Sequence, residues 1–147
     1  MDSGLPDLLK PGLQILLIGI NPGTRSAEVG HHFAGRSNRF WKFLFESGLT
    51  PVKYDAFNDS KLLDLGYGIT NIAPRTTATA AELTPVELKE GALVLLRKIK
   101  KNKPRIAAYL GKVVYQYLSG RRDFDWGQQD LSLVSGWLIL YCLTPVG

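Results

Sequence analysis

The sequence contains little cysteine and histidine and no long apolar run. One cysteine, Cys142, cannot form an internal disulfide, and one cysteine with two histidines is too few for a zinc or iron–sulfur site. No apolar stretch reaches the roughly 20 residues of a membrane-spanning helix. Residues 1–7 also lack the basic-then-apolar pattern of a signal peptide. We therefore expect a cytoplasmic protein that needs no cofactor and no metal.

The remaining composition fits one basic globular domain. The chain has 147 residues, of which 45% are hydrophobic, and this suits a single domain with its own core over residues 1–147. Lysine and arginine total 18 against 13 acidic residues, and seven of the basic residues fall between Arg97 and Lys112. A surface of this kind favours a polyanionic partner without identifying it.

Strand-like apolar runs alternate with helix-like patterns along the chain. Residues 13–20 form a continuous apolar run, typical of a strand in a parallel sheet that is covered on both faces. Thr84 is the clearest helix start, because proline follows it and Glu87 is placed to close a capping box. The other expected elements are strands at 69–72, 105–110 and 137–143 and helices at 37–48, 58–65 and 111–118. The alternation predicts a three-layer α/β/α sandwich with a mostly parallel central sheet.

The helix expected at 37–48 has a clear inward face. Either Ser37 or Asn38 is suited to cap its start. The large apolar side chains then recur at helical spacing and are expected to pack inward: Phe40, Trp41, Leu44 and Phe45.

Polar side chains follow the carboxyl ends of the first two expected strands. Binding sites in such sheets form in the crevice beyond these ends, where Asn21 and Asn71 lie in the sequence. The turn at 19–24 has neither the spacing of a phosphate-binding loop nor that of a dinucleotide-binding loop, so nucleotide binding there is not expected. By residue type alone, Asn21 also suits a simple turn, and Phe33 also suits the core.

Several short motifs together point to one known family. They are G-I-N-P-G at 19–23, a phenylalanine at 33, S-N-R-F-W at 37–41, G-I-T-N at 68–71, P-R-T-T at 74–77, K-P-R-I-A at 103–107 and L-G-K at 110–112. With them the chain resembles the mismatch-specific uracil-DNA glycosylases, a group that includes thymine-DNA glycosylase, within the uracil-DNA glycosylase superfamily. The resemblance covers almost the whole chain. It implies a DNA repair enzyme that hydrolyses the N-glycosidic bond of uracil, or of a related damaged pyrimidine, in G:U mismatched double-stranded DNA and leaves an abasic site.

The resemblance also implies roles for individual residues. Asn21 would hold the attacking water through its side-chain oxygen. Ile20 would contact the base through its main chain, and Gly23 would let the backbone approach the base or sugar. Phe33 would stack on the flipped pyrimidine, and Asn71 would hydrogen-bond to the base edge, because a carboxamide both donates and accepts.

Contacts to the DNA strands are expected from residues that flank the motifs. They are Arg25, Arg36, Arg39, Arg75, Lys112, Thr144, Pro145 and Gly147. The bacterial relatives carry N-P-S-G and then a wedge loop where this chain has Thr144-Pro145-Val146-Gly147. We expect the wedge loop and the last helix of the family to be missing, which would make a flipped base harder to hold.

Other interpretations of these residues stay open. Asp64 is an alternative general base, although its usual role would be at a solvated helix end. His31 and His32 are adjacent and have no third ligand in sight, so we expect them on a loop surface or against DNA. The lysines at 98–103 suit a solvated helix end, and no lysine within the motifs suits lyase chemistry.

Two other classes of function also stay open. One is a module that binds damaged duplex DNA without excising a base, and the other is a hydrolase of small molecules on a similar α/β sandwich. Phosphate contacts make affinity fall steeply with salt, which separates the DNA-binding functions from the small-molecule hydrolase. We expect a monomer with double-stranded DNA as its partner.

Overall fold

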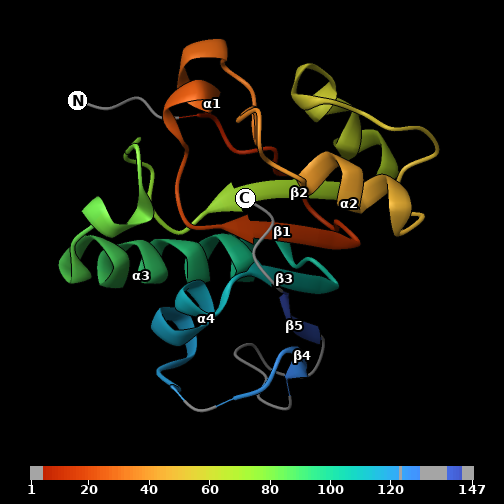
Figure 1. Ribbon diagram of the computed structural model, residues 1–147. Coiled ribbons are helices and arrows are strands. Elements are labelled where there is room, and N and C mark those ends of the chain that lie inside the picture. Colours follow the sequence, from red (N-terminus) through yellow and green to blue (C-terminus); the bar gives the residue numbers. More distant parts are fainter. Residues whose placement is uncertain (1–4, 123, 130–138, 144–147) are drawn as a thin grey trace.

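A five-stranded sheet forms the centre of the molecule (Figure 1). The computed structural model describes residues 5–122, 124–129 and 139–143. In spatial order the strands are β2 (Tyr67–Asn71), β1 (Ile15–Gly19), β3 (Ile106–Leu110), β5 (Ile139–Leu143) and β4 (Gly127–Gln129). The first four strands are parallel, and only β4 pairs antiparallel, with β5. The predicted mostly parallel sheet is therefore confirmed, with β4 as an addition that the sequence did not indicate.

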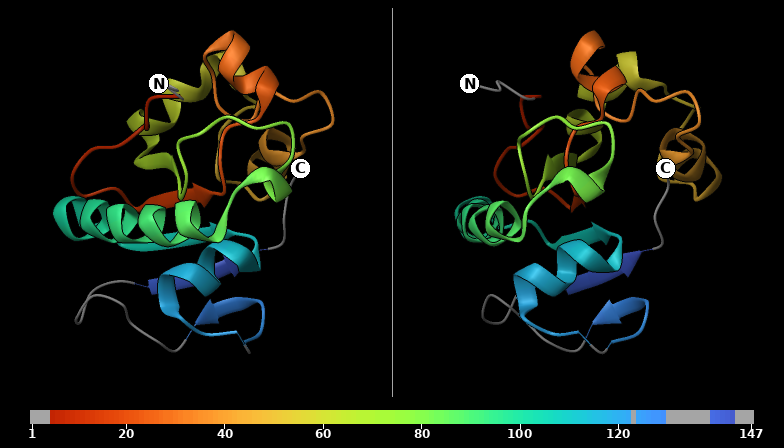
Figure 2. Two further views of the ribbon diagram at one scale, coloured as in Figure 1. Left: turned by 90° about the vertical axis from the view of Figure 1, so that its left-hand side faces the viewer. Right: turned by 60° about the vertical axis from the view of Figure 1, so that its left-hand side comes forward.

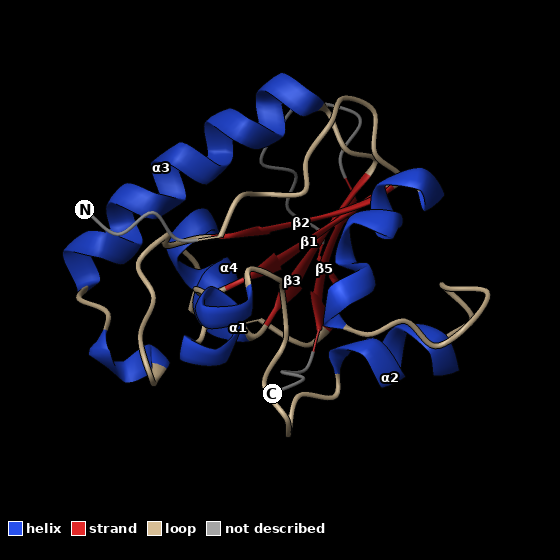
Figure 3. Ribbon diagram, turned by 90° about the horizontal axis from the view of Figure 1, so that it is seen from above, coloured by secondary structure: helices blue, strands red, loops and turns tan. Residues whose placement is uncertain are grey.

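Helices cover both faces of the sheet, which gives three layers. On one face lie α3 (Pro85–Asn102) and α4 (Lys112–Ser119), and on the other lie α2 (Phe40–Glu46) and the 3₁₀ helix η1 (Ala56–Leu65). Figure 3 shows α3 and α2 on opposite sides of the strands, and the right-hand view of Figure 2 looks almost along α3. Two short helices, α1 (Thr24–Val29) and η2 (Ala80–Glu82), follow β1 and β2.

Alternation of side chains along β1 explains the two cores. Leu16 and Ile18 pack against α3 and α4, whereas Leu17 between them packs against α2 and η1. This is the period-two geometry of a strand, so a strand that is covered on both faces is apolar at every position. The apolar run at 13–20 is explained in this way, and the predicted α/β sandwich is confirmed.

The predicted start of α3 is confirmed in detail. The Thr84 hydroxyl accepts a hydrogen bond from the Glu87 N–H at 3.1 Å, and the Glu87 carboxylate accepts one from the Thr84 N–H at 2.7 Å. This reciprocal pair satisfies two N–H groups that have no partner inside the helix. In the described residues, none of the helices combines the length and the apolar character that crossing a bilayer requires.

The prediction for α2 needs one correction. Phe40, Trp41 and Leu44 are buried as expected, but the side chain of Phe45 is 42% exposed. Phe45 follows Leu44 by one residue, which turns it about 100° around the helix axis and away from the sheet. Asn38 does act at the start of the helix, because its Oδ1 accepts a hydrogen bond from the Phe40 N–H at 2.8 Å.

Candidate active site

A cleft of about 490 Å³ lies at the carboxyl ends of the central strands. Gly19, Asn71 and Leu110 line it from the ends of β1, β2 and β3. The remaining lining comes mainly from the loop after β1 and from the segment after β2, and it includes Ile20, Asn21, Pro22, Gly23, Thr24, Arg25, Ser26, His32, Phe33, Gly35, Asn38, Thr77, Ala78 and Ala80. The fold thus brings Asn21 and Asn71, 50 positions apart in the sequence, to one cleft.

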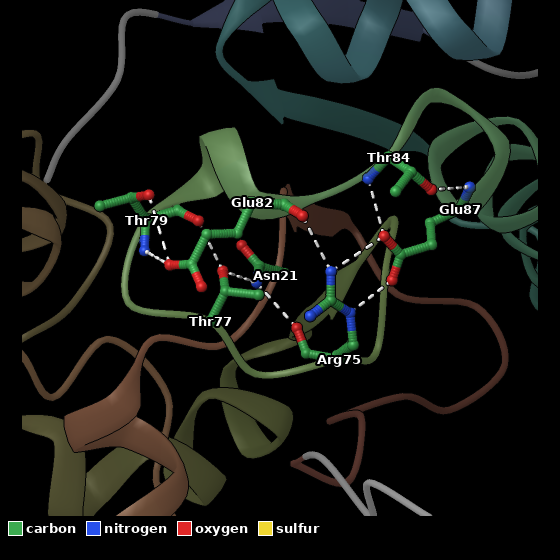
Figure 4. Close-up of polar contacts among 7 residues, drawn as sticks. All are labelled: Asn21, Arg75, Thr77, Thr79, Glu82, Thr84 and Glu87. Carbon is green, nitrogen blue, oxygen red and sulfur yellow. Dashed lines mark hydrogen bonds and ion pairs between the residues drawn. The ribbon is translucent and has the colours of Figure 1, made fainter.

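The carboxamide of Asn21 is held in one orientation (Figure 4). Its Nδ2 donates hydrogen bonds to the main-chain oxygen of Arg75 and to the hydroxyl of Thr77, both at 2.8 Å. The Thr77 hydroxyl donates its own proton to the Thr79 carbonyl at 2.7 Å, so it presents a lone pair to Asn21. Within the described residues the Asn21 Oδ1 accepts no hydrogen bond. That oxygen is therefore left to bind a group in the cleft.

Phe33 and Asn71 border a second wall of the cleft, with Gly19 between them. A Cβ atom on Gly19 would stand 2.7 Å from the Asn71 Oδ1 and 3.6 Å from the Phe33 Cζ, so only glycine leaves these side chains undisturbed. Within the described residues the Asn71 side chain makes no hydrogen bond. An aromatic ring and a carboxamide without a partner therefore meet at the end of β1.

The backbone of Phe33 has an unusual conformation that its surroundings maintain. Its φ is 54°, in the left-handed region that few residues other than glycine adopt. The ring stacks on the fully buried Phe40, with 3.9 Å between ring centroids and 17° between planes. The Phe33 carbonyl accepts a hydrogen bond from the Trp41 Nε1 at 3.2 Å. Strain that the fold maintains in this way is concentrated at functional sites in proteins.

Comparison with known protein families shows the superfamily to which the chain belongs. The sequence model described as the Uracil DNA glycosylase superfamily matches residues 6–145. The chain belongs to the uracil DNA glycosylase superfamily. Membership implies a DNA glycosylase, a hydrolase of N-glycosidic bonds that acts on uracil or a damaged base in DNA. The match is to the superfamily, so the mismatch-specific group within it is a proposal.

Asp64, the alternative general base, does not line the cleft of this superfamily member. It is exposed near the end of η1, which leads into β2 at Tyr67. The cleft lies at the other end of β2, at Asn71. The structure therefore brings Asn21, Phe33 and Asn71 together and leaves Asp64 apart from them.

A buried carboxylate that the sequence analysis missed lies behind the cleft. Asp59 is 4% exposed and accepts a hydrogen bond from the His32 N–H at 2.8 Å, and it contacts the His31 Nδ1 at 3.1 Å. The His32 Nε2 lies 2.8 Å from the Pro6 carbonyl, which can only accept, so Nε2 carries a proton. The histidines were expected on a loop surface or against DNA, and the first of these is wrong for His32, which is 3% exposed because these contacts bury it.

The residues expected to contact DNA do not all lie at the cleft. Arg25 lines the cleft, and Arg36 and Arg39 are exposed on the loop whose Gly35 and Asn38 also line it. The Lys112 ammonium instead donates to the Phe124 carbonyl at 2.9 Å and lies 4.8 Å from the centroid of the Trp126 ring. Three further predicted contacts lie outside the described residues: Thr144, Pro145 and Gly147.

Arg75 is bound to the first turn of α3. Its guanidinium donates to both carboxylate oxygens of Glu87, at 2.5 and 3.0 Å, and to the Glu82 carbonyl at 2.9 Å. The Arg75 hydrogen bond, followed in size by that of the Thr84 N–H, lowers the pKa of Glu87 from 4.5 to about 2. The guanidinium of this exposed side chain is thus bound by a carboxylate that also caps α3.

Two further expectations concern charge and metal. Lys98, expected at a solvated helix end, is half-buried and pairs with Asp7 at 2.5 Å in a separate cleft of about 390 Å³. In the part of the chain that the structure describes, no three His, Cys, Asp or Glu side chains lie close enough to hold a metal ion.

Proposed function

We propose that this superfamily member is a monofunctional, mismatch-specific uracil-DNA glycosylase. Its substrate would be uracil, or a related damaged pyrimidine, in G:U mismatched double-stranded DNA, and its product an abasic site. The observation that carries the proposal is the Asn21 carboxamide, whose Nδ2 is held by Arg75 and Thr77 while Oδ1 is left at a cleft bordered by Phe33 and Asn71. A monomer in the cytoplasm is proposed with it.

The proposed chemistry rests on positioning and not on a strong base. Glycosidic bonds break through a transition state with oxocarbenium character. Uracil can leave as a delocalised anion, so a general acid is less necessary than for sugars. The Asn21 Oδ1 accepts a hydrogen bond from a water, which aims the water oxygen at the anomeric carbon. An amide cannot take up the proton as a carboxylate would, so we expect slow turnover and a strong dependence on the leaving group.

Recognition of the base is proposed to combine stacking with an amide pair. A cleft of about 490 Å³ lies within the ~300–1,000 Å³ of sites that enclose small ligands. The Phe33 ring offers a face to the flipped pyrimidine. The Asn71 carboxamide can donate to a carbonyl and accept from the N–H of the base edge. Extruding a mismatched base costs less than extruding a paired one, so mispairing itself contributes selectivity.

Affinity for the duplex is proposed to come from the arginines at the cleft. Arg25, Arg36 and Arg39 are exposed, and no ion pair in the described residues involves them. Each phosphate they neutralise adds about 0.9 to the slope of log affinity against log salt. A steep slope without base release would favour a binding module without catalysis, and a flat slope would favour a small-molecule hydrolase.

The test uses a labelled duplex with one uracil opposite guanine. The wild-type chain, Asn21→Ala and the control Asp64→Ala are compared by strand breakage after alkali under single-turnover conditions. We expect Asn21→Ala to lose roughly 10²-fold in rate, since a misplaced reactant costs about that much, and Asp64→Ala to match the wild type. Equal breakage by Asn21→Ala and the wild type would refute the role of the amide. Loss of activity in Asp64→Ala alone would move that role to the carboxylate.

A further inference from the structure

The Asn21 side chain has two possible orientations, related by a half-turn that exchanges its oxygen and nitrogen. Both atoms that the Asn21 nitrogen contacts can only accept a hydrogen bond from it. The Arg75 atom is a carbonyl oxygen, and the Thr77 hydroxyl has already donated its proton to Thr79. A turned amide would place its oxygen against two acceptors at the 2.8 Å that now separate Nδ2 from each of them. The surroundings therefore select one orientation.

The contact between the Thr77 hydroxyl and the Thr79 carbonyl is itself held in place. Thr79 is fixed because its N–H donates a hydrogen bond to the Glu82 carboxylate at 2.8 Å, in the capping box of η2. The Thr77 N–H donates to the Pro22 carbonyl at 3.3 Å, so the main chain of this segment is paired with the loop that carries Asn21. Thr77 is 6% exposed, and water has little access to replace its contacts. Figure 4 shows the series of contacts.

We propose that Thr77 is a positioning residue: its hydroxyl, polarised toward Thr79, fixes the Asn21 carboxamide so that Oδ1 faces the reacting water. The inference rests on the proposed glycosylase function, because it gives Asn21 the water. Thr77 itself touches neither the base nor the sugar in this scheme. It acts through Asn21, and its contribution vanishes when Asn21 is absent.

The kinetic test compares Thr77→Val with Thr77→Ser. Valine keeps the shape and removes the acceptor, whereas serine keeps the hydroxyl. A neutral hydrogen bond contributes a factor of roughly 2 to 12. We therefore expect Thr77→Val to release uracil about 2- to 12-fold more slowly in single turnover, with the dissociation constant for the duplex unchanged. Thr77→Ser should recover most of the wild-type rate.

A double-mutant cycle separates positioning from general structural damage. In the Asn21→Ala background, Thr77→Val should change the rate by less than twofold, because the group it orients is gone. An equal slowing in both backgrounds would overturn the proposal, and so would a Thr77→Val enzyme as fast as the wild type. Thermal unfolding of each variant identifies any that has lost its fold.

A spectroscopic readout keeps the test independent of catalysis. In ¹⁵N-labelled protein, the Asn21 side-chain resonances are assigned by their loss in Asn21→Ala. We expect slow proton exchange for this amide in the wild type and in Thr77→Ser, and faster exchange of one proton in Thr77→Val. Unchanged exchange in Thr77→Val overturns the positioning role. If the wild-type chain releases no base from any duplex, the proposed function fails, whereas the exchange data still decide the orientation of the amide.

Discussion

Replacing Gly19 by alanine tests the proposed base-binding wall with the smallest possible change. The new Cβ would lie 2.7 Å from the Asn71 Oδ1, and ordinary contact begins at 3.4 Å, so this oxygen must retreat by about 0.7 Å. The obstacle is the end of a side chain that can rotate, and the φ of Gly19 is not in the left-handed region. Alanine in a strand is favoured over glycine by about 0.5–1 kcal/mol. We therefore expect the stability of the fold to be unchanged or slightly raised.

The cost of Gly19→Ala should appear in recognition of the base. A shift of about 0.7 Å at Oδ1 spoils the hydrogen bonds that the Asn71 carboxamide is proposed to make with a pyrimidine edge. Losing one or two neutral hydrogen bonds costs about 1–3 kcal/mol in total. This corresponds to roughly a 5- to 150-fold fall in kcat/KM. The stability and the activity of the variant are thus expected to move independently.

The assay combines uracil release from a G:U duplex with thermal unfolding. Asn71→Ala provides the matched control, because it removes the oxygen that the new methyl group displaces. On that background Gly19→Ala should add less than a twofold loss. The reasoning is refuted if Gly19→Ala retains at least half of the wild-type kcat/KM while Asn71→Ala is strongly impaired. A large fall in the Tm of Gly19→Ala would also refute the reasoning, because it would show that the Asn71 side chain cannot rotate away from the new methyl group.

Two further predictions concern stability. The pKa of Glu87 is lowered to about 2 in the folded protein, so its contribution to stability is present above about pH 4.5 and is lost as the pH falls toward 2. Glu87→Gln lacks this carboxylate, and its Tm should therefore decline less steeply with acid than the Tm of the wild type. Parallel curves of Tm against pH would contradict this. In Gly91→Ala, the new Cβ would lie 1.9 Å from the Ile72 carbonyl oxygen, which is main chain and cannot rotate away. The gain of about 1 kcal/mol in helix propensity should be outweighed by overpacking of about 1–3 kcal/mol or more, so urea unfolding should show lower stability, and an unchanged midpoint would exclude the clash.

The sequence predicted those parts of the fold that depend on local patterns. The capping box of Thr84 and Glu87 joins residues three positions apart, so its partners can be read from a short stretch. The burial of β1 is encoded in the same local way, because a strand covered on both faces needs an unbroken apolar run. A parallel sheet then places the carboxyl ends of β1 and β2 at one edge, which is how Asn21 and Asn71 were expected near one site.

The contacts that shape the site were beyond this kind of prediction. Asp59 reaches His31 across 28 positions, and Thr77 reaches Asn21 across 56. No local spacing signals either pair, and the buried Asp59 has the same residue type as the exposed Asp64 five positions later. Burial decides between them, and burial is a property of the packed chain. The left-handed backbone of Phe33 could not be predicted from the sequence either, since a residue of its type usually avoids that conformation.

Arg75 contributes to the proposed site through both its main chain and its side chain. Its guanidinium is bonded to the Glu87 carboxylate, which reduces the charge it can offer to a phosphate, while its main-chain oxygen orients the Asn21 amide. Glu87 in turn closes the first turn of α3. One carboxylate therefore connects the start of the longest helix to the proposed water-binding group. We therefore expect a perturbation of that turn to change the rate of the proposed base release, whereas Arg25, which lines the cleft, is proposed to contact the DNA backbone.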